Sequence, residues 1–106
     1  MSFLSKHIIA LNRLEKRVGN QEIKLEEMHK KAEQVLRKLR ELETFILKNY
    51  GEKQGDILIE RTLKAEMEAI SRCLSFNQFD EAEARVKHVQ AEVLRQAVGQ
   101  SGVAYA

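Results

Sequence analysis

The sequence contains no proline and no tryptophan, and its four Phe and two Tyr make up only 6% of the chain. All-β sandwiches and barrels need aromatic and β-branched strands separated by Gly/Pro turns, so this composition argues against them. The remaining residues are dominated by Leu, Ala, Glu, Lys, Arg and Gln, which are strong helix formers. A length of 106 residues suits one small domain. We therefore expect an all-α protein.

Cysteine and long apolar runs are also scarce. The single Cys73 excludes an intrachain disulfide framework and is consistent with a reducing compartment. Near the N-terminus, Ser5, Lys6 and His7 interrupt the apolar run that a signal peptide would need. No stretch approaches the roughly 18 apolar residues of a membrane span. We expect a cytoplasmic protein without a membrane partner.

An apolar heptad runs through the first half of the chain. With Leu4 at position a, all seven a positions up to Ile46 are apolar, and so are four of the seven d positions. This exceeds the three or four heptads that indicate a coiled coil. The pattern predicts a long coiled-coil helix over about 4–49. Its predicted interaction seam consists of Leu4, Leu11, Leu14, Val18, Leu25, Met28, Ala32, Val35, Leu39, Leu42 and Ile46.

The pair Gly19-Asn20 leaves two alternatives for this helix. Glycine inside a helix costs only about 1 kcal/mol relative to alanine, and the heptad stays in phase, which allows a continuous or gently kinked helix. The same pair also suits a C-cap followed by an N-cap. In that case a short helix over 3–18 would precede a longer one over 20–49.

The second half of the chain predicts a two-helix hairpin in a small helical bundle. Gly51, Gly55 and Asp56 mark the segment 51–56 as a linker. The apolar period then predicts helices over about 57–75 and 78–97, with a change of phase at 75–78 where Asn77 suits an N-cap. One bent helix is the alternative. We assign 1–98 to a single helical, coiled-coil domain and 99–106 to a flexible C-terminal tail.

The sequence shows no recognisable catalytic motif. It lacks phosphate-binding and dinucleotide-binding glycine loops and Cys/His metal spacings. Glu26-x-x-His29 has the spacing of a di-iron bundle site, but the second such pair is missing. Cys73 has no nearby His and fits a small core residue, while His7 fits a frayed first turn. We expect a non-enzyme with no catalytic, cofactor-binding or metal site and no small-molecule partner.

Basic residues follow the predicted seam as a flank. Arg17, Lys24, Lys31 and Lys38 occupy successive g positions. In a parallel homodimer, g residues face the following e residues of the other chain, which would pair Arg17 with Glu22 and Lys38 with Glu43. The pattern therefore favours a parallel self-pair or an acidic partner helix.

These features predict a helical protein–protein interaction module, such as a small adaptor, assembly factor or chaperone. The chain would bind a partner helix or itself, as a homodimer or in a helical hetero-complex. The alternative is a basic accessory protein whose cationic stripe binds nucleic acid, although the net charge is only +2. Phosphate binding would weaken steeply as salt rises, whereas seam pairing would not.

Overall fold

The computed structural model describes residues 3–101 and the side chains of residues 3–97. A 3-10 turn, η1 (Phe3–Lys6), leads into α1 (Leu11–Gly19) and the long α2 (Glu26–Leu58). A π-helical turn, η2 (Ile59–Leu63), continues into α3 (Lys64–Ser75), and α4 (Phe79–Ser101) follows. This part of the chain contains no strand, which confirms the all-α prediction.

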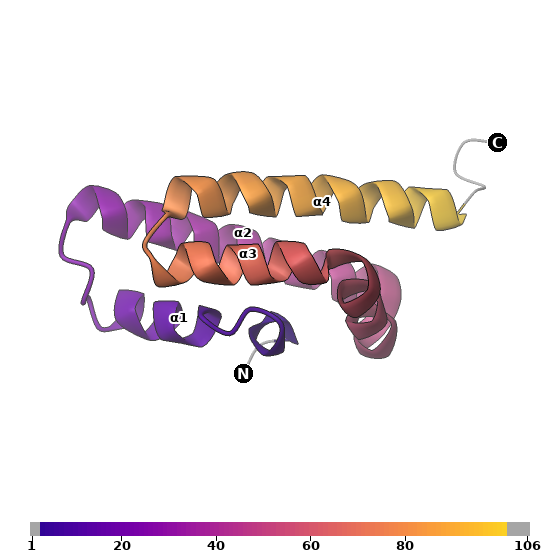
Figure 1. The fold of residues 1–106 in the computed structure, drawn as a ribbon, viewed down its shortest axis with the longest axis horizontal. Coiled ribbons are helices and arrows are strands. Elements are labelled where there is room, and N and C mark those ends of the chain that lie inside the picture. Colours follow the sequence, from indigo (N-terminus) through magenta and orange to yellow (C-terminus); the bar gives the residue numbers. More distant parts are fainter. Residues whose placement is uncertain (1–2, 102–106) are drawn as a thin grey trace.

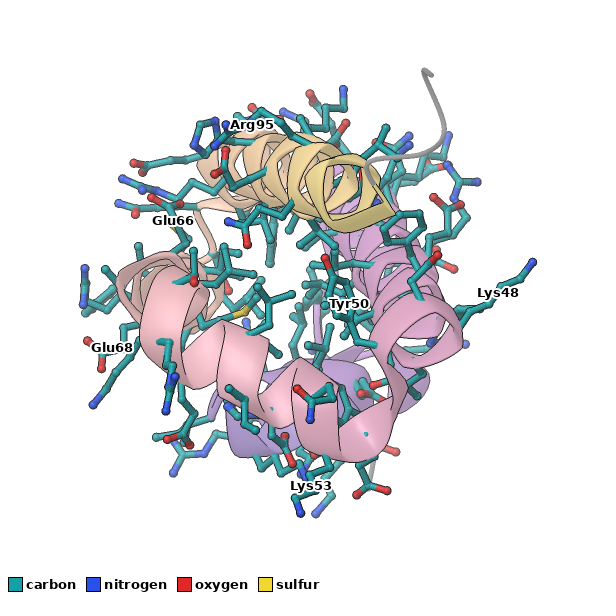
Figure 2. The ribbon with its side chains drawn as sticks, turned by 90° about the vertical axis from the view of Figure 1, so that its right-hand side faces the viewer. Lys48, Tyr50, Lys53, Glu66, Glu68 and Arg95 are labelled. Atoms are coloured by element: carbon teal, nitrogen blue, oxygen red, sulfur yellow. The ribbon has the colours of Figure 1, made fainter. Side chains whose placement is uncertain are left out.

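The helices form an elongated four-helix arrangement of about 50 × 23 × 21 Å (Figure 1). α2 and α4 run in the same direction, as the Lys31–Asp80 ion pair and the hydrogen bond from Gln90 to the Lys38 carbonyl show. α1 and α3 run the opposite way, and the last part of α2 (residues 52–58) crosses one end of the bundle together with η2 (Figures 1 and 2). Seen along the long axis, Tyr50 points into the ring of helices, while Lys48 and Lys53 point to solvent (Figure 2).

The predicted helix over 4–49 is broken, as in the second alternative, but α1 begins at Leu11 rather than at residue 3, and α2 begins at Glu26 rather than at residue 20. α1 ends in a Schellman motif in which Glu22 N–H donates to the Arg17 carbonyl and Gln21 N–H to the Val18 carbonyl. Gln21 has a φ of 55° and takes the left-handed position that glycine usually occupies. Residues 20–25 then reverse the chain, so that α1 lies antiparallel to α2 (Figure 1).

The predicted linker over 51–56 is also shorter than expected. Only Gly51 leaves the helical conformation, with φ 78° and ψ 171°. The chain is helical again directly afterwards, so the helix predicted to start near 57 starts at 52. The second glycine serves packing instead, because a Cβ on Gly55 would lie 2.8 Å from Ile46 Cγ2 and 3.0 Å from Phe3 Cζ.

The predicted hairpin of the last two helices is present, but Asn77 has another role than the expected N-cap. Gln78 N–H donates to the Cys73 carbonyl, and Asn77, with a φ of 58°, occupies the left-handed position of a second Schellman motif. Asn77 thus terminates α3. α4 continues to Ser101, past the boundary at 98, and the rest of the predicted tail, 102–106, lies outside the described residues.

One hydrophobic core joins all the helices. α3 and α4 face it with the two apolar stripes that the sequence shows, including Met67, Ile70 and Leu74 and then Val86, Val89 and Val93. Phe3, Leu4 and Ile8 anchor the N-terminal segment in the same core. The core therefore fixes the orientation of every helix and decides which side chains remain on the surface.

Candidate interaction surface

Most of the predicted seam lies inside the chain's own core. Val18 and Met28 are half-buried, and Leu25 is 71% exposed. The remaining seam residues are buried within the bundle: Leu4, Leu11, Leu14, Ala32, Val35, Leu39, Leu42 and Ile46. The heptad therefore identifies the buried face of α1 and α2, and this face is covered by the same chain.

Leu25 departs from the seam because the helix is interrupted before it. Its φ of −71° and ψ of 120° are extended, and it immediately precedes α2. The preceding residues have lost the helical phase, and Ile23, two residues earlier, is buried instead. Leu25, although it occupies an a position of the heptad, is therefore exposed to solvent.

The predicted basic flank is not one stripe in the structure. Arg17 lies on α1 and donates to Asn77 Oδ1 at 2.8 Å, and Lys24 is exposed in the segment between α1 and α2. Lys31 pairs with Asp80 at 3.0 Å, and the distance from Lys38 Nζ to Glu41 is 4.0 Å. The break at 20–25 separates the first two cations from the last two.

Three large apolar side chains are more than two-thirds exposed to solvent. Ile9 is 80% exposed, Phe76 73% and Leu25 71%. Phe76 directly follows α3 and Leu25 directly precedes α2, so both lie at the end of the bundle where the chain turns between α3 and α4 (Figure 1). Isolated exposed apolar residues are ordinary, but side chains this bare beside unpaired charge suggest contact with a partner.

Two of these residues border the surface where α1 lies along α3, which we call the α1–α3 face: Ile9, Arg13, Lys16, Arg17, Arg72 and Phe76. The two helices are held together by Ala10 N–H, which donates to Ser71 Oγ at 3.2 Å, and by the Arg17–Asn77 hydrogen bond. Arg13 lies one turn before Arg17 on the same side of α1. Arg72 lies one turn before Phe76 on the outer side of α3.

The cations of the α1–α3 face have no anionic partner within the described residues. Arg13, Lys16 and Arg72 make no hydrogen bond or ion pair there, and Arg17 contacts only a neutral amide. On the opposite side of the bundle, five cations each pair with a carboxylate: Lys31, Lys38, Arg85, Lys87 and Arg95. Unpaired cations also occur on α2, namely Arg37, Arg40 and Lys48, but on the α1–α3 face none of the four cations has a carboxylate partner among the described residues.

A cavity of about 200 Å³ opens at the Ile9 end of this face. The buried side chains of Ile59 and Met67 line it, together with the charged residues Glu60, Lys64 and Glu68 around its rim. The π-helical turn η2 contributes Ile59 and Glu60. Such turns are rare and often mark functional positions, because the extra residue per turn displaces side chains from their α-helical place.

The sequence suggested that His7 lies in a frayed first turn. In the structure, His7 is instead held in place beside this cavity. Its Nε2 lies 2.8 Å from Asp56 Oδ1, and Lys6 Nζ lies 3.0 Å from Asp56 Oδ2. The His7 ring also packs edge-on against Phe3, with centroids 5.7 Å apart. This network ties the N-terminal turn to the helix that follows Gly51, a contact between residues 49 positions apart that no local pattern reveals.

The network gives the fold a predictable response to acid. The hydrogen bond with His7, and then that from Lys6, lowers the pKa of Asp56. The ionised carboxylate therefore stabilises the fold above about pH 4, and this contribution is lost as the pH falls through the lower folded-state pKa. We expect Asp56→Asn to melt at a lower temperature than wild type near pH 6, with the difference shrinking below about pH 3.

Thermal melts followed by circular dichroism at several pH values will measure this difference. Glu60→Gln is a matched control, because Glu60 is exposed and makes no ion pair within the described residues. A D56N chain that melts like wild type at every pH would show that the network does not stabilise the fold.

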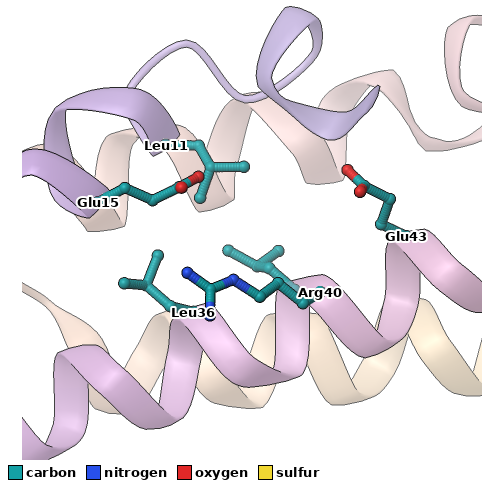
Figure 3. A pocket seen from close by; sticks show the side chains of 6 residues that line it. Leu11, Glu15, Leu36, Arg40 and Glu43 are labelled. Atoms are coloured by element: carbon teal, nitrogen blue, oxygen red, sulfur yellow. The ribbon is translucent and has the colours of Figure 1, made fainter. Parts of the chain in front are cut away.

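A second cleft, of about 190 Å³, lies between α1 and α2 (Figure 3). Leu11, Leu36 and Leu39 form its apolar lining, and Glu15 and Arg40 approach it from opposite helices (Figure 3). Glu43, at one end, accepts the Leu4 backbone N–H at 2.9 Å. That carboxylate caps the N-terminal turn, so the cleft is the junction between two packed helices.

His29 and Cys73, the residues that the sequence analysis weighed for metal binding and catalysis, have contacts typical of structural residues. His29 Nε2 lies 3.1 Å from Glu33, one turn away, and not against Glu26. Cys73 is buried, and burial raises the pKa of its thiol, which disfavours the nucleophilic thiolate. Among the described residues, no group of three or more His, Cys, Asp or Glu side chains could hold a metal ion. No helix in this part of the chain combines the length and apolarity needed to cross a membrane.

Comparisons with known proteins add no assignment. Neither a scan against protein-family models nor searches of curated proteins and of solved structures found a match to this chain.

Proposed function

We propose that this chain is a non-enzymatic helical interaction module that binds another protein through its surface. The observation that carries the proposal is the exposure of Ile9, Leu25 and Phe76 on a bundle whose core is otherwise closed. Adaptors, assembly factors and chaperones all need such a surface. A single cysteine among 106 residues supports work in a reducing compartment such as the cytoplasm.

Two features support a surface contact over the seam contact and the nucleic-acid alternative. A coiled-coil partner on the seam would have to displace the chain's own helices, because Leu39, Leu42 and Ile46 are buried against them. The basic flank that would follow a phosphate backbone is divided by the break at 20–25, and two of its members, Lys31 and Lys38, are ion-paired. Neither a coiled-coil partner on the seam nor a phosphate backbone along the basic flank fits the packing of α1 and α2.

Affinity capture from native lysate tests the proposal. We expect the wild-type chain to retain a protein at a fixed stoichiometry, and the triple variant I9S/L25S/F76S to lose it. Leu94→Ser is the matched control, because Leu94 is half exposed on α4, away from all three residues. Circular dichroism must show that each variant folds. A chain that retains no protein, or a triple variant that retains the same proteins, would contradict the proposal.

A further inference from the structure

We propose that the α1–α3 face binds an acidic, amphipathic helix of another protein, which places an apolar side chain in the cavity beside Ile9 and a second one against Phe76. This inference rests on the proposed function and names the partner's chemistry. It combines three independent observations: uncompensated cations, two bare apolar residues and an apolar-lined cavity.

The charge of the face requires an acidic partner. Four cations on α1 and α3 lack a carboxylate partner within the described residues. Glu68 is the carboxylate on the neighbouring row of α3, beside Ile9. Carboxylates on a docking helix would pair with Arg13, Lys16 and Arg72, which gives the encounter speed and orientation.

The apolar residues determine the spacing of the partner's anchors. Ile9 lies beside Glu68 at the cavity, and Phe76 follows Glu68 by eight residues on α3. At 1.5 Å per residue, the two contact points are about 12 Å apart. Residues separated by seven or eight positions lie on the same face of a helix at about this distance. An amphipathic helix can therefore contact both points at once, the mode of binding known for helices in grooves.

A protein helix fits the face better than a phosphate backbone does. A cavity of about 200 Å³ lined by the buried Ile59 and Met67 suits one aliphatic or aromatic side chain of a docking helix. Single-stranded nucleic acid usually binds through several stacking aromatics, and Phe76 is the one aromatic of this face.

A synthetic peptide tests the inference directly. The probe is a helical peptide of about 20 residues, with leucines at i, i+4 and i+8 and glutamates on its flanks. We expect it to bind the wild-type chain in the micromolar range and to bind more weakly as salt rises. We expect I9S/F76S to lower the affinity at least about tenfold, since apolar anchors carry most of the binding energy in such contacts.

Charge reversal separates electrostatic recognition from apolar contact. R13E/R72E should weaken binding of the glutamate peptide by about tenfold and strengthen binding of a peptide with lysines in place of its glutamates. Leu94→Ser and Arg37→Glu are the matched controls, because both side chains are exposed on α4 and α2 without a charged partner among the described residues. Both should bind the glutamate peptide like wild type.

Three results would overturn the inference: no binding of the glutamate peptide, equal binding by I9S/F76S, or tighter binding of an oligothymidine or of phosphatidylserine vesicles than of the peptide. The last would assign the face to phosphate groups. Failure here is distinguishable from failure of the proposed function, because a lysate partner lost by I9S/L25S/F76S would still establish an interaction module.

Discussion

Replacing Leu42 by alanine should lower the free energy of unfolding by about 2–5 kcal/mol, the cost of a cavity in a packed core. Leu42 lies on α2 and is fully buried in the hydrophobic core. Leu25→Ala removes the same side-chain atoms from another core position of the predicted heptad pattern. Because Leu25 is exposed, the effect on the free energy of unfolding should stay within about 0.5 kcal/mol. Chemical denaturation of the two variants and of wild type will measure the difference.

Protein concentration distinguishes an internal core from an intermolecular seam. A seam shared by two chains would make the melting temperature rise with concentration, because association stabilises the folded state by mass action. A core within one chain predicts the same midpoint at low and high micromolar concentration. Equal destabilisation by L42A and L25A, or a concentration-dependent midpoint for wild type, would return the seam to the role that the heptad suggests.

The heptad was informative about burial and misleading about the covering partner. An amphipathic helix shows the same period whether its apolar stripe faces another chain or its own. Leu11 and Leu14 on α1 and Leu39 and Leu42 on α2 are all buried, as their positions predict. What reversed the interpretation is the turn over 20–25, where Gln21 adopts a left-handed conformation that its residue type does not announce.

Local signals predicted the second half of the chain better. The change of apolar phase at 75–78 marks the turn between α3 and α4, because a hairpin must present a new face on each side of its turn. Gly51 and Gly55 look alike in sequence, yet one bends the backbone and the other admits Ile46 and Phe3. Only the tertiary packing distinguishes these two uses of glycine.

The candidate surface could not be predicted from the sequence, because it is assembled from separate helices. Arg13 and Arg72 stand on α1 and α3 and share a face only since residue 10 packs beside residue 71. Phe76 lies in the predicted change of phase at 75–78, and only the Schellman motif at the end of α3 shows that it is left in solvent. Uncompensated charge is likewise visible only after every ion pair is known.

Replacing Gly51 by alanine should destabilise the fold by about 1–3 kcal/mol through backbone strain alone. Gly51 has φ 78° and ψ 171°, a region that is essentially restricted to glycine, and it is where α2 bends to cross the end of the bundle. A Cβ at this position would meet no atom within 4 Å, so a steric clash contributes nothing. Gly19→Ala is the control: its Cβ also meets nothing, φ is not positive, and we expect a neutral change or a gain of up to about 1 kcal/mol.

A D-alanine at position 51, introduced by chemical synthesis, separates strain from every other cause. The mirror image of φ 78° and ψ 171° lies at negative φ in the extended region that L-residues favour, so a D-residue adopts the native angles without cost. We expect D-alanine to restore or exceed wild-type stability, since it also narrows the unfolded ensemble. Thermal melts that rank D-alanine with L-alanine would contradict the prediction, because they would show that backbone strain at residue 51 does not cause the loss of stability.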